Sequence, residues 1–265
     1  MGEARMEPTT LNGKIIVVTG GTQGIGEAVA VLAAQRGAMG IVICGRGQEN
    51  GERVVTKLQG IGSEALYVQA DLLEVDQCRN VIASAKERFG QIDGLVNAAA
   101  ITNRGTIENT SEELFDRMFA INVRAPFFLM QATLKIMQAA GRGGSIVNIS
   151  STSAHGGQPF ITAYCTSKGA LAVLTKNVAH SQRQHRIRVN AVNMGWTATP
   201  NEHKIQLADG NPENWLETAD SHAPLGRILR PRDVAGITCY LLSDEAKMMT
   251  GSIIDFDQKV IGAFD

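Results

Sequence analysis

The segment AYCTSK, residues 163–168, holds a phenol and an ammonium four residues apart among small side chains. On a helix, positions i and i+4 lie on one face, so Tyr164 and Lys168 would point in the same direction. A nearby ammonium favours the ionised form of a phenol, whose pKa of ~10 is otherwise too high for proton exchange near neutral pH. A half-buried tyrosine beside a lysine stem gives the same spacing without chemistry, and the pair alone does not decide between the two.

A hydroxyl group precedes this pair. The segment NISS, residues 148–151, ends an apolar run typical of a strand, and Ser151 lies thirteen residues before Tyr164. Ligands of open α/β sheets bind at the carboxyl ends of the strands. Because a hydroxyl both donates and accepts hydrogen bonds, Ser151 could hold a substrate oxygen in either redox state.

A glycine-rich loop stands near the start of the chain. The segment VTGGTQGIGEAVA, residues 18–30, follows an apolar run and opens a helix-like stretch. Glycines at such a place allow a tight turn, a close approach of the backbone to a pyrophosphate, and close packing of helix on sheet. In this context they predict a dinucleotide site, and the lack of a Gly-Lys-Ser/Thr triplet argues against a P-loop. The residues expected to contact the cofactor here are Gly20, Thr22, Gln23, Gly24, Ile25 and Gly26.

The choice of cofactor depends on the end of the second predicted strand. An acidic residue there binds the ribose hydroxyls of NAD, whereas an arginine accommodates the 2′-phosphate of NADP. The chain has Arg46 and no carboxylate at this point, which favours NADP(H) and leaves NAD(H) possible, since Arg46 could be an ordinary surface arginine. Asp71 and Leu72 follow the third strand, where we expect them to contact the adenine of the cofactor. Asp71 could instead cap the next helix.

These residues need a parallel sheet to bring them together. Apolar, β-branched runs at 14–19, 40–45, 65–70, 92–98, 144–150, 187–192 and 252–256 alternate with helix-length stretches. The alternation predicts an α/β fold, a doubly wound parallel sheet of about seven strands with helices on both faces. We expect a flexible tail over 1–10 and a single domain over 11–265. Residues 200–230 are polar and interrupt the alternation of strands and helices. This predicts a mobile lid with short helices or, alternatively, a variable surface excursion.

The composition excludes several classes of partner. A net charge of −1 lacks the excess of positive charge that is typical of nucleic-acid-binding proteins. No apolar run is long enough for a membrane span. Four widely separated cysteines predict neither disulfides nor a metal site. We therefore expect a cytoplasmic protein whose partner is a small molecule.

Taken together, the glycine loop, NAAA (97–100), NISS and Tyr-x-x-x-Lys resemble the short-chain dehydrogenase/reductase family over essentially the whole chain. The resemblance implies a Rossmann-type fold, in a dimer or tetramer, that moves hydride between NAD(P) and an alcohol or carbonyl. It implies Tyr164 as the acid/base, Lys168 as its activator and a ligand of the cofactor ribose, and Ser151 as the group orienting the substrate oxygen. It also implies cofactor contacts at Asn97, Gly195, Thr197 and Thr199.

Asn122 is the fourth catalytic residue that the resemblance implies. The stretch 119–138 is typical of a long helix, but it contains Pro126. Proline has no N–H, so the carbonyl of Asn122 would lose its helical partner. We expect a kink that frees this carbonyl to hold a water in a proton relay to Lys168; a kink with a packing role only is the alternative.

The chain also departs from the family pattern. Ala100 stands in place of a glycine, Met194 in place of a proline, and DFDQ (255–258) in place of Val-Asp-Gly-Gly. None of these changes removes a group that transfers a proton. The last one leaves open how the end of the chain would pack against a neighbouring subunit.

The substrate side should be formed by residues flanking the reactive groups. Besides Ser151 and Tyr164, these are Ser153, His155, Gln158, Trp196 and Trp215. Aromatic and polar groups together suit a sugar, polyol or hydroxy acid. His155 could equally be structural, and Trp215 could simply anchor the 200–230 segment. Two alternatives are a 3-oxoacyl thioester reductase, which the acidic balance of residues 200–230 disfavours, and a non-catalytic dinucleotide sensor, which would not need Asn122, Ser151, Tyr164 and Lys168.

Overall fold

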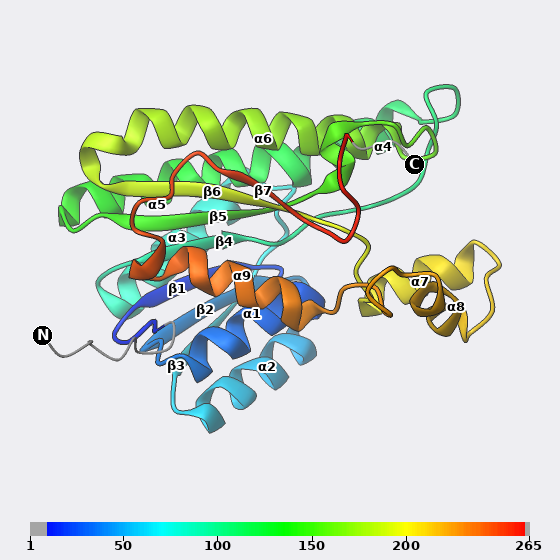
Figure 1. Ribbon diagram of the computed structural model, residues 1–265. Coiled ribbons are helices and arrows are strands. Elements are labelled where there is room, and N and C mark those ends of the chain that lie inside the picture. The colour runs from blue at the N-terminus through cyan, green and yellow to red at the C-terminus, as the bar shows by residue number, and fades with distance from the viewer. Residues whose placement is uncertain (1–9, 263–265) are drawn as a thin grey trace, which may run out of the picture.

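One sheet of seven parallel strands organises the computed structural model, which describes residues 10–262 (Figure 1). The order across the sheet is β3-β2-β1-β4-β5-β6-β7. Each strand lies within two residues of its expected position, so the parallel α/β fold is confirmed. The expected tail, apart from Thr10, lies outside the described residues. The strands are β1 (Ile15–Thr19), β2 (Gly40–Gly45), β3 (Glu64–Gln69), β4 (Gly94–Asn97), β5 (Gly144–Ser151), β6 (Ile187–Met194) and β7 (Ile253–Phe256).

Helices cover both faces of this sheet (Figure 1). One face carries α1 (Gly24–Gln35), α2 (Gln48–Ile61) and α9 (Pro231–Leu242), and the other carries α3 (Val75–Phe89), α5 (Ala125–Ala140) and α6 (Thr162–Gln182). Side chains alternate between the two cores along each strand, so that Val18 packs on the first face and Val17 on the second. Burial on both faces explains why the strands are continuously apolar.

The strand order opens a crevice at the carboxyl edge of the sheet. The chain runs outward from β1 through β2 and β3, and then returns to place β4 on the other side of β1. The loops after β1 and β4 therefore diverge, which is where ligands bind in doubly wound sheets. Thr19 pairs with Asn97, and Asn97 with Asn148, so the loops after β1, β4 and β5 begin at nearly the same level.

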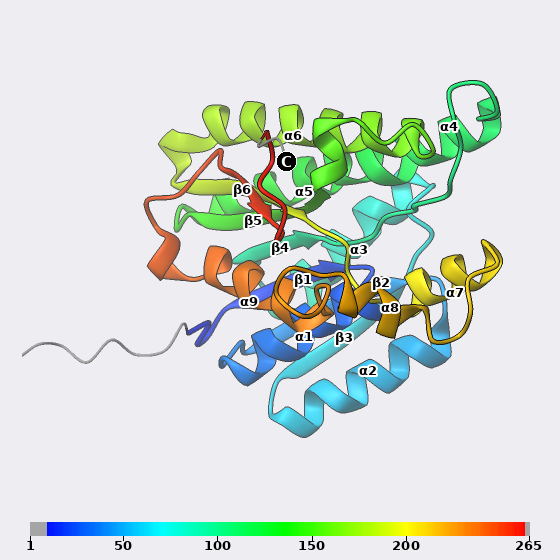
Figure 2. The same cartoon turned by 45° about the vertical axis from the view of Figure 1, so that its right-hand side comes forward.

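Two short helices interrupt the alternation where the sequence predicted them. They are α7 (Pro200–Ala208) and α8 (Trp215–Ser221), and they stand beyond the carboxyl edge of the sheet (Figures 1 and 2). Trp215, Ala219 and Ile228 are buried together in a small cluster of their own, separate from the two main cores. The 200–230 segment thus forms short helices beside the crevice.

The expected long helix over 119–138 is built differently. The structure has α4 (Glu112–Phe119), a π-helical turn η1 (Ala120–Arg124), and then α5. The N–H of Ala125 donates to the carbonyl of Ala120, five residues earlier. Pro126 lies in the first turn of α5, where a missing N–H is tolerated. The irregularity at Asn122 is therefore a π turn, a feature frequent at functional sites, and not a proline kink inside one helix.

Short 3-10 turns complete the described elements. One of them, η2 (Thr152–His155), leads directly from β5 toward α6; the others are η3 (Arg183–His185) and η4 (Asp244–Ala246). Within residues 10–262, no helix has both the length and the hydropathy that crossing a bilayer requires.

Candidate active site

A cavity of about 960 Å³ lies at the carboxyl edge of the sheet. This volume is at the upper end of the range for ligand pockets. Of the residues predicted for the site, the cavity wall includes Gly20, Thr22, Gln23, Gly24, Ile25, Gly26, Arg46, Asp71, Leu72, Ser151, Ser153, Gln158, Tyr164, Lys168, Gly195, Trp196, Thr197 and Thr199. It does not include Asn97, Asn122, His155 and Trp215.

The glycine loop has the backbone that a pyrophosphate site needs. Gly20 and Gly24 have φ values of 64° and 56°, in the left-handed region that favours glycine. A Cβ on Gly26 would lie 2.3 Å from the carbonyl oxygen of Gly20, so this position has no room for a side chain. Helix α1 begins here, and its N-cap residue Gln23 makes no side-chain capping bond. The first N–H groups of α1 are thus left for an anion, and the loop fits a dinucleotide phosphate.

The far end of the cavity presents Arg46, Asn50 and Asp71. Among the described residues, no hydrogen bond or ion pair involves the Arg46 guanidinium. Arg53, by contrast, is engaged by Glu27 at 2.7 Å and by the carbonyl of Thr22. Asp71 does not cap α3, whose N-cap is Glu74; its carboxylate accepts from the N–H of Leu73 at 3.0 Å and shapes the loop after β3.

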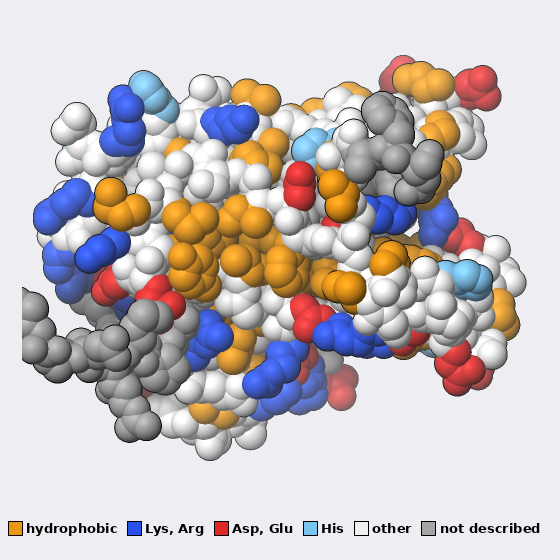
Figure 3. All heavy atoms as spheres, viewed as in Figure 1, with side chains coloured by type: hydrophobic (Ala, Val, Ile, Leu, Met, Phe, Trp, Pro, Cys, Tyr) orange, Lys and Arg blue, Asp and Glu red, His pale blue; other side chains and the backbone are white. Residues whose placement is uncertain are grey.

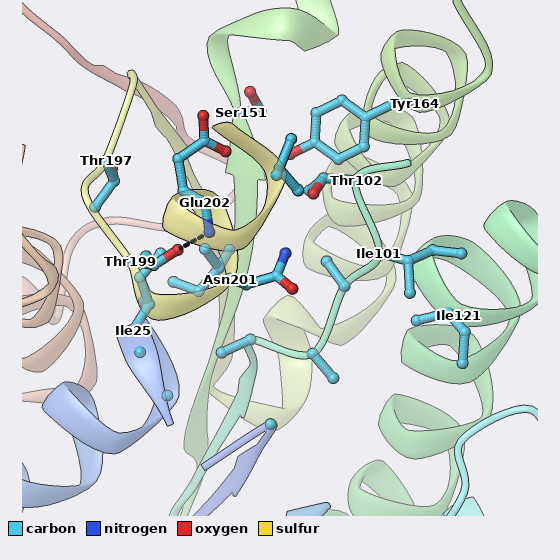
Figure 4. A pocket seen from close by; sticks show the side chains of 18 of the residues that line it. Ile25, Ile101, Thr102, Ile121, Ser151, Tyr164, Thr197, Thr199, Asn201 and Glu202 are labelled. Carbon is cyan, nitrogen blue, oxygen red and sulfur yellow. Dashed lines mark hydrogen bonds between the residues drawn. The ribbon is translucent and has the colours of Figure 1, made fainter. Parts of the chain in front are cut away.

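The reactive groups predicted from the sequence meet at the other end of the cavity. Ser151 ends β5, and Tyr164 and Lys168 occupy one face of α6. Tyr164 is only 6% exposed and Lys168 only 2%. Lys168 donates to the carbonyl of Ile149 at 2.8 Å, and its ammonium lies 5.6 Å from the centroid of the Tyr164 ring. Figure 4 shows the Tyr164 ring and Ser151 on the same side of the cavity.

Burial controls the ionisation of this pair. Desolvation raises the pKa of the Tyr164 phenol to about 12, although the Ser151 hydroxyl acts in the opposite direction. Desolvation also lowers the pKa of Lys168 to about 8. In the protein without cofactor, desolvation therefore dominates the pKa of Tyr164. The expectation that Lys168 and the oxidised nicotinamide together favour the phenolate stays a prediction.

The two asparagines absent from the cavity wall tie α6 in place. Asn122 donates to Ser167 of α6 and to the carbonyl of Ile101, and its Oδ1 accepts from the Ile101 N–H, each at 3.0–3.1 Å. Asn97 donates to Asn148, which donates to Thr175 of α6. Both residues thus hold the helix that carries Tyr164 and Lys168. The proposed relay through the Asn122 carbonyl stays a prediction.

The other two residues off the cavity wall link surface segments. His155 lies 2.8 Å from Asp255 of the DFDQ segment, which also accepts from Asn193. Trp215 donates its indole N–H to His203 at 2.9 Å, an anchoring contact within the 200–230 segment. Both positions fit the structural alternatives that the sequence left open.

The atypical DFDQ segment packs on the body of the protein itself. Asp257 fills the space beside Gly195, where a Cβ would meet its carboxyl carbon at 2.2 Å. Gln258 accepts from the N–H of Leu225 and donates to the carbonyl of Arg227. The segment thus ties the 200–230 region to the end of β6.

Sequence reasoning missed part of the cavity wall. The loop after β4 contributes residues 101–104, and the 200–230 segment contributes Asn201, Glu202, Ile205 and Gln206. Arg104 pairs with Asp209 at 2.8 Å and lies over the Phe160 ring, which joins three segments across the cavity mouth. The position of the β4 loop at the switch point of the sheet was the signal available for residues 101–104.

Comparison with known proteins agrees with this geometry. A family model described as enoyl-(acyl carrier protein) reductase matches residues 20–258. An uncharacterized oxidoreductase of Thermotoga maritima is 37% identical, over 92% of this chain and 96% of that protein. A 3-oxoacyl-(acyl-carrier-protein) reductase of the same organism is 36% identical, over 93% and 97%. Galactitol 2-dehydrogenase of Agrobacterium fabrum is 32% identical, over 93% and 97%.

A solved structure shares the whole architecture. The crystal structure of a short-chain type dehydrogenase/reductase from Mycobacterium marinum matches with a TM-score of 0.87 at 32% identity. The match covers 96% of this chain and 98% of that one.

Proposed function

The chain belongs to the short-chain dehydrogenase/reductase family, and we propose that it interconverts a secondary alcohol and a ketone on a small hydroxylated molecule, of the sugar, polyol or hydroxy acid type. One observation carries this proposal: Ser151, Tyr164 and Lys168 share a cavity with a glycine loop suited to a dinucleotide phosphate. The galactitol dehydrogenase among its relatives supports the substrate class.

The cofactor would be held by the glycine loop, by Asp71 and by Thr199, and when bound it exchanges hydride with the substrate carbon. The protein's own groups move the proton. In reduction, Tyr164 gives the proton on its phenol oxygen to the substrate oxygen, and in oxidation the phenolate takes it back. The Ser151 hydroxyl holds that oxygen in both states. A Tyr164 pKa of about 12 keeps the phenol protonated, as reduction requires.

NADP(H) is the preferred cofactor in this proposal, with NAD(H) as the alternative. Arg46 lines the cavity and, among the described residues, has no partner for its guanidinium. It is therefore available for a 2′-phosphate, and no carboxylate stands at the end of β2 to bind ribose hydroxyls.

Two other functions are alternatives to this activity. A 3-oxoacyl thioester reductase has support from the relative of that name and from Arg117 and Lys259, cations on the cavity wall that suit an anionic carrier. A non-catalytic dinucleotide sensor is the alternative of a different class. It would not require a serine, a buried tyrosine and a buried lysine at the same end of the cavity.

We further propose a cytoplasmic homo-oligomer, a dimer or tetramer. The four cysteines are free thiols, as a reducing compartment favours. Hydrophobic side chains gather in the middle of the face that carries α9 and β7 (Figure 3). β7 is an edge strand of the sheet, and a second copy of the chain could cover both.

The proposal is tested by titrating the purified protein with NADPH and NADH and then assaying reduction of small ketoses, hydroxy-ketones and acetoacetyl thioesters. Binding followed by turnover of a hydroxylated ketone is the expected result. Preferred turnover of the thioesters would favour the reductase alternative, and tight binding without any turnover would favour the sensor.

A further inference from the structure

Glu202 has an unusual orientation for its place in the sequence. The pattern Thr199-x-x-Glu202 is that of a capping box, in which the glutamate reaches back to the start of its helix. Only the first half forms: the N–H of Glu202 donates to the Thr199 hydroxyl at 3.0 Å. The carboxylate instead accepts from the indole N–H of Trp196 at 2.8 Å and from the Gln206 amide at 2.7 Å. Two donors thus fix it away from the helix end.

The fixed carboxylate faces the reactive groups. Figure 4 shows the Glu202 side chain directed toward the part of the cavity where Ser151 and Tyr164 lie. Its negative charge contributes to the raised pKa of Tyr164, which places the two groups within electrostatic range. Both donors bond the same oxygen, Oε1. Within residues 10–262, no hydrogen bond or ion pair reaches Oε2, so that oxygen is left to a ligand.

Beside this carboxylate stands an aromatic wall. Trp196 lines the cavity with 47% of its surface exposed, and its ring stacks on Trp215 at a centroid distance of 5.5 Å. The exposed indole face is apolar and suits the C–H groups of a carbon chain. An ionised carboxylate only accepts hydrogen bonds, and it binds hydroxyl donors with charge-assisted strength. The wall and the carboxylate together complement a carbon skeleton that carries hydroxyl groups.

We propose that Glu202 accepts a hydrogen bond from a second hydroxyl of the substrate, so that the substrate is a neutral polyol or sugar. The inference rests on the proposed function and narrows it. Ser151 and Tyr164 take the reacting oxygen, which leaves the carboxylate for a neighbouring hydroxyl. A hydroxy acid would bring a second negative charge next to Glu202, and a 3-oxoacyl thioester has no hydroxyl group beside its reacting carbonyl. Both are therefore disfavoured.

Binding tests this subsite without relying on turnover. The protein has two tryptophans, and both lie here, so intrinsic fluorescence reports the subsite directly. The holoenzyme, saturated with reduced cofactor so that no alcohol is oxidised, is titrated with butane-2,3-diol, butan-2-ol and lactate. We compare the wild type, Glu202→Gln, and the control Glu217→Gln, which changes an exposed glutamate of α8 outside the cavity wall. Glutamine keeps the size of Glu202 and an acceptor for Trp196, and it removes the charge.

Glu202→Gln should weaken binding of butane-2,3-diol by about tenfold or more while changing that of butan-2-ol by less than about threefold. Glu217→Gln should match the wild type. Equal losses for both alcohols, absence of diol binding to the wild type, or tighter binding of lactate than of the diol would overturn the inference.

Turnover of the same alcohols separates this inference from the proposed function. Charge-dependent binding of the diol without oxidation by either cofactor would support the subsite and contradict the dehydrogenase activity. Equal turnover of both alcohols in wild type and Glu202→Gln would support the activity and contradict the subsite.

Discussion

At the scale of single residues, burial sets the chemistry of the site. Tyr164 and Lys168 lie almost entirely out of water, and desolvation shifts both pKa values toward the neutral forms. The phenol is held as an acid, and the ammonium becomes able to lose its proton near pH 8. Among the residues that the structure describes, the Lys168 ammonium makes one hydrogen bond, to the carbonyl of Ile149, and this bond fixes its position beside the tyrosine ring.

Lys168 should make the stability of the protein depend on pH. Its pKa is about 8 when folded, against an ordinary 10.5, so the unfolded chain holds more protons between these values. In this window the wild type should gain stability relative to Lys168→Met as pH rises, by roughly 1.4 kcal/mol per pH unit. Urea unfolding of both proteins at pH 7 and pH 9.5 measures the difference. A difference that does not change with pH would contradict the depressed pKa.

Arg46 should determine the choice of cofactor. Arg46→Asp replaces a cation with a group that binds ribose hydroxyls and repels a 2′-phosphate. We expect the ratio of the NADPH and NADH dissociation constants to shift toward NADH by about tenfold or more. Fluorescence titration with both cofactors gives this ratio. An unchanged ratio would reject a contact between Arg46 and the phosphate.

At the scale of elements, the local patterns predicted the parts that depend on backbone geometry. The glycine loop, the end of β5 and the helix with Tyr164 and Lys168 were recognisable because each needs particular residues at a fixed spacing. The orientation of Glu202 was not, because the capping-box pattern predicts one partner and Trp196 and Gln206 supply others. The π turn at Asn122 was also missed, since hydrophobic periodicity does not distinguish a π turn from a kink.

Substitution of Gly26 should test the fit of the glycine loop. Gly26→Ala would place a methyl group 2.3 Å from a backbone oxygen of Gly20, so the loop must shift. We expect NADPH binding to weaken by about tenfold or more, since such overpacking costs roughly 1–3 kcal/mol.

Gly60→Ala provides the matched control. Gly60 lies in α2 with open space around its Cβ position. This change should leave NADPH binding intact and raise stability by about 0.5–1 kcal/mol. Calorimetric titration with NADPH measures the affinity of both variants. Equal affinities of Gly26→Ala and Gly60→Ala for NADPH would show that the loop does not approach the cofactor.

At the scale of the whole molecule, the fold class follows from few signals. Alternating apolar runs and helices leave a doubly wound parallel sheet as the simplest arrangement, and the structure has it. The ion pairs that join distant segments around the site could not be predicted in the same way. The Arg104–Asp209 and His155–Asp255 pairs each join residues about a hundred positions apart, which no local pattern connects.

The exposed apolar face should be covered by a second copy of the chain in solution. Met248 is 89% exposed, and it lies between α9 and the edge strand β7 in the sequence. Light scattering coupled to gel filtration should give a mass of two or four times 28.3 kDa. A mass of one chain at micromolar concentration would contradict the proposed oligomer.

The role of Tyr164 as the proton donor is tested most directly by the turnover of Tyr164→Phe with a ketone that the wild type reduces. The substitution removes only the phenol oxygen and leaves the ring in place. Acid/base catalysis of this kind contributes about 10²–10⁴-fold, so kcat should fall at least about a hundredfold while NADPH affinity stays within about threefold. A variant that retains a tenth or more of the wild-type kcat would show that another group transfers the proton.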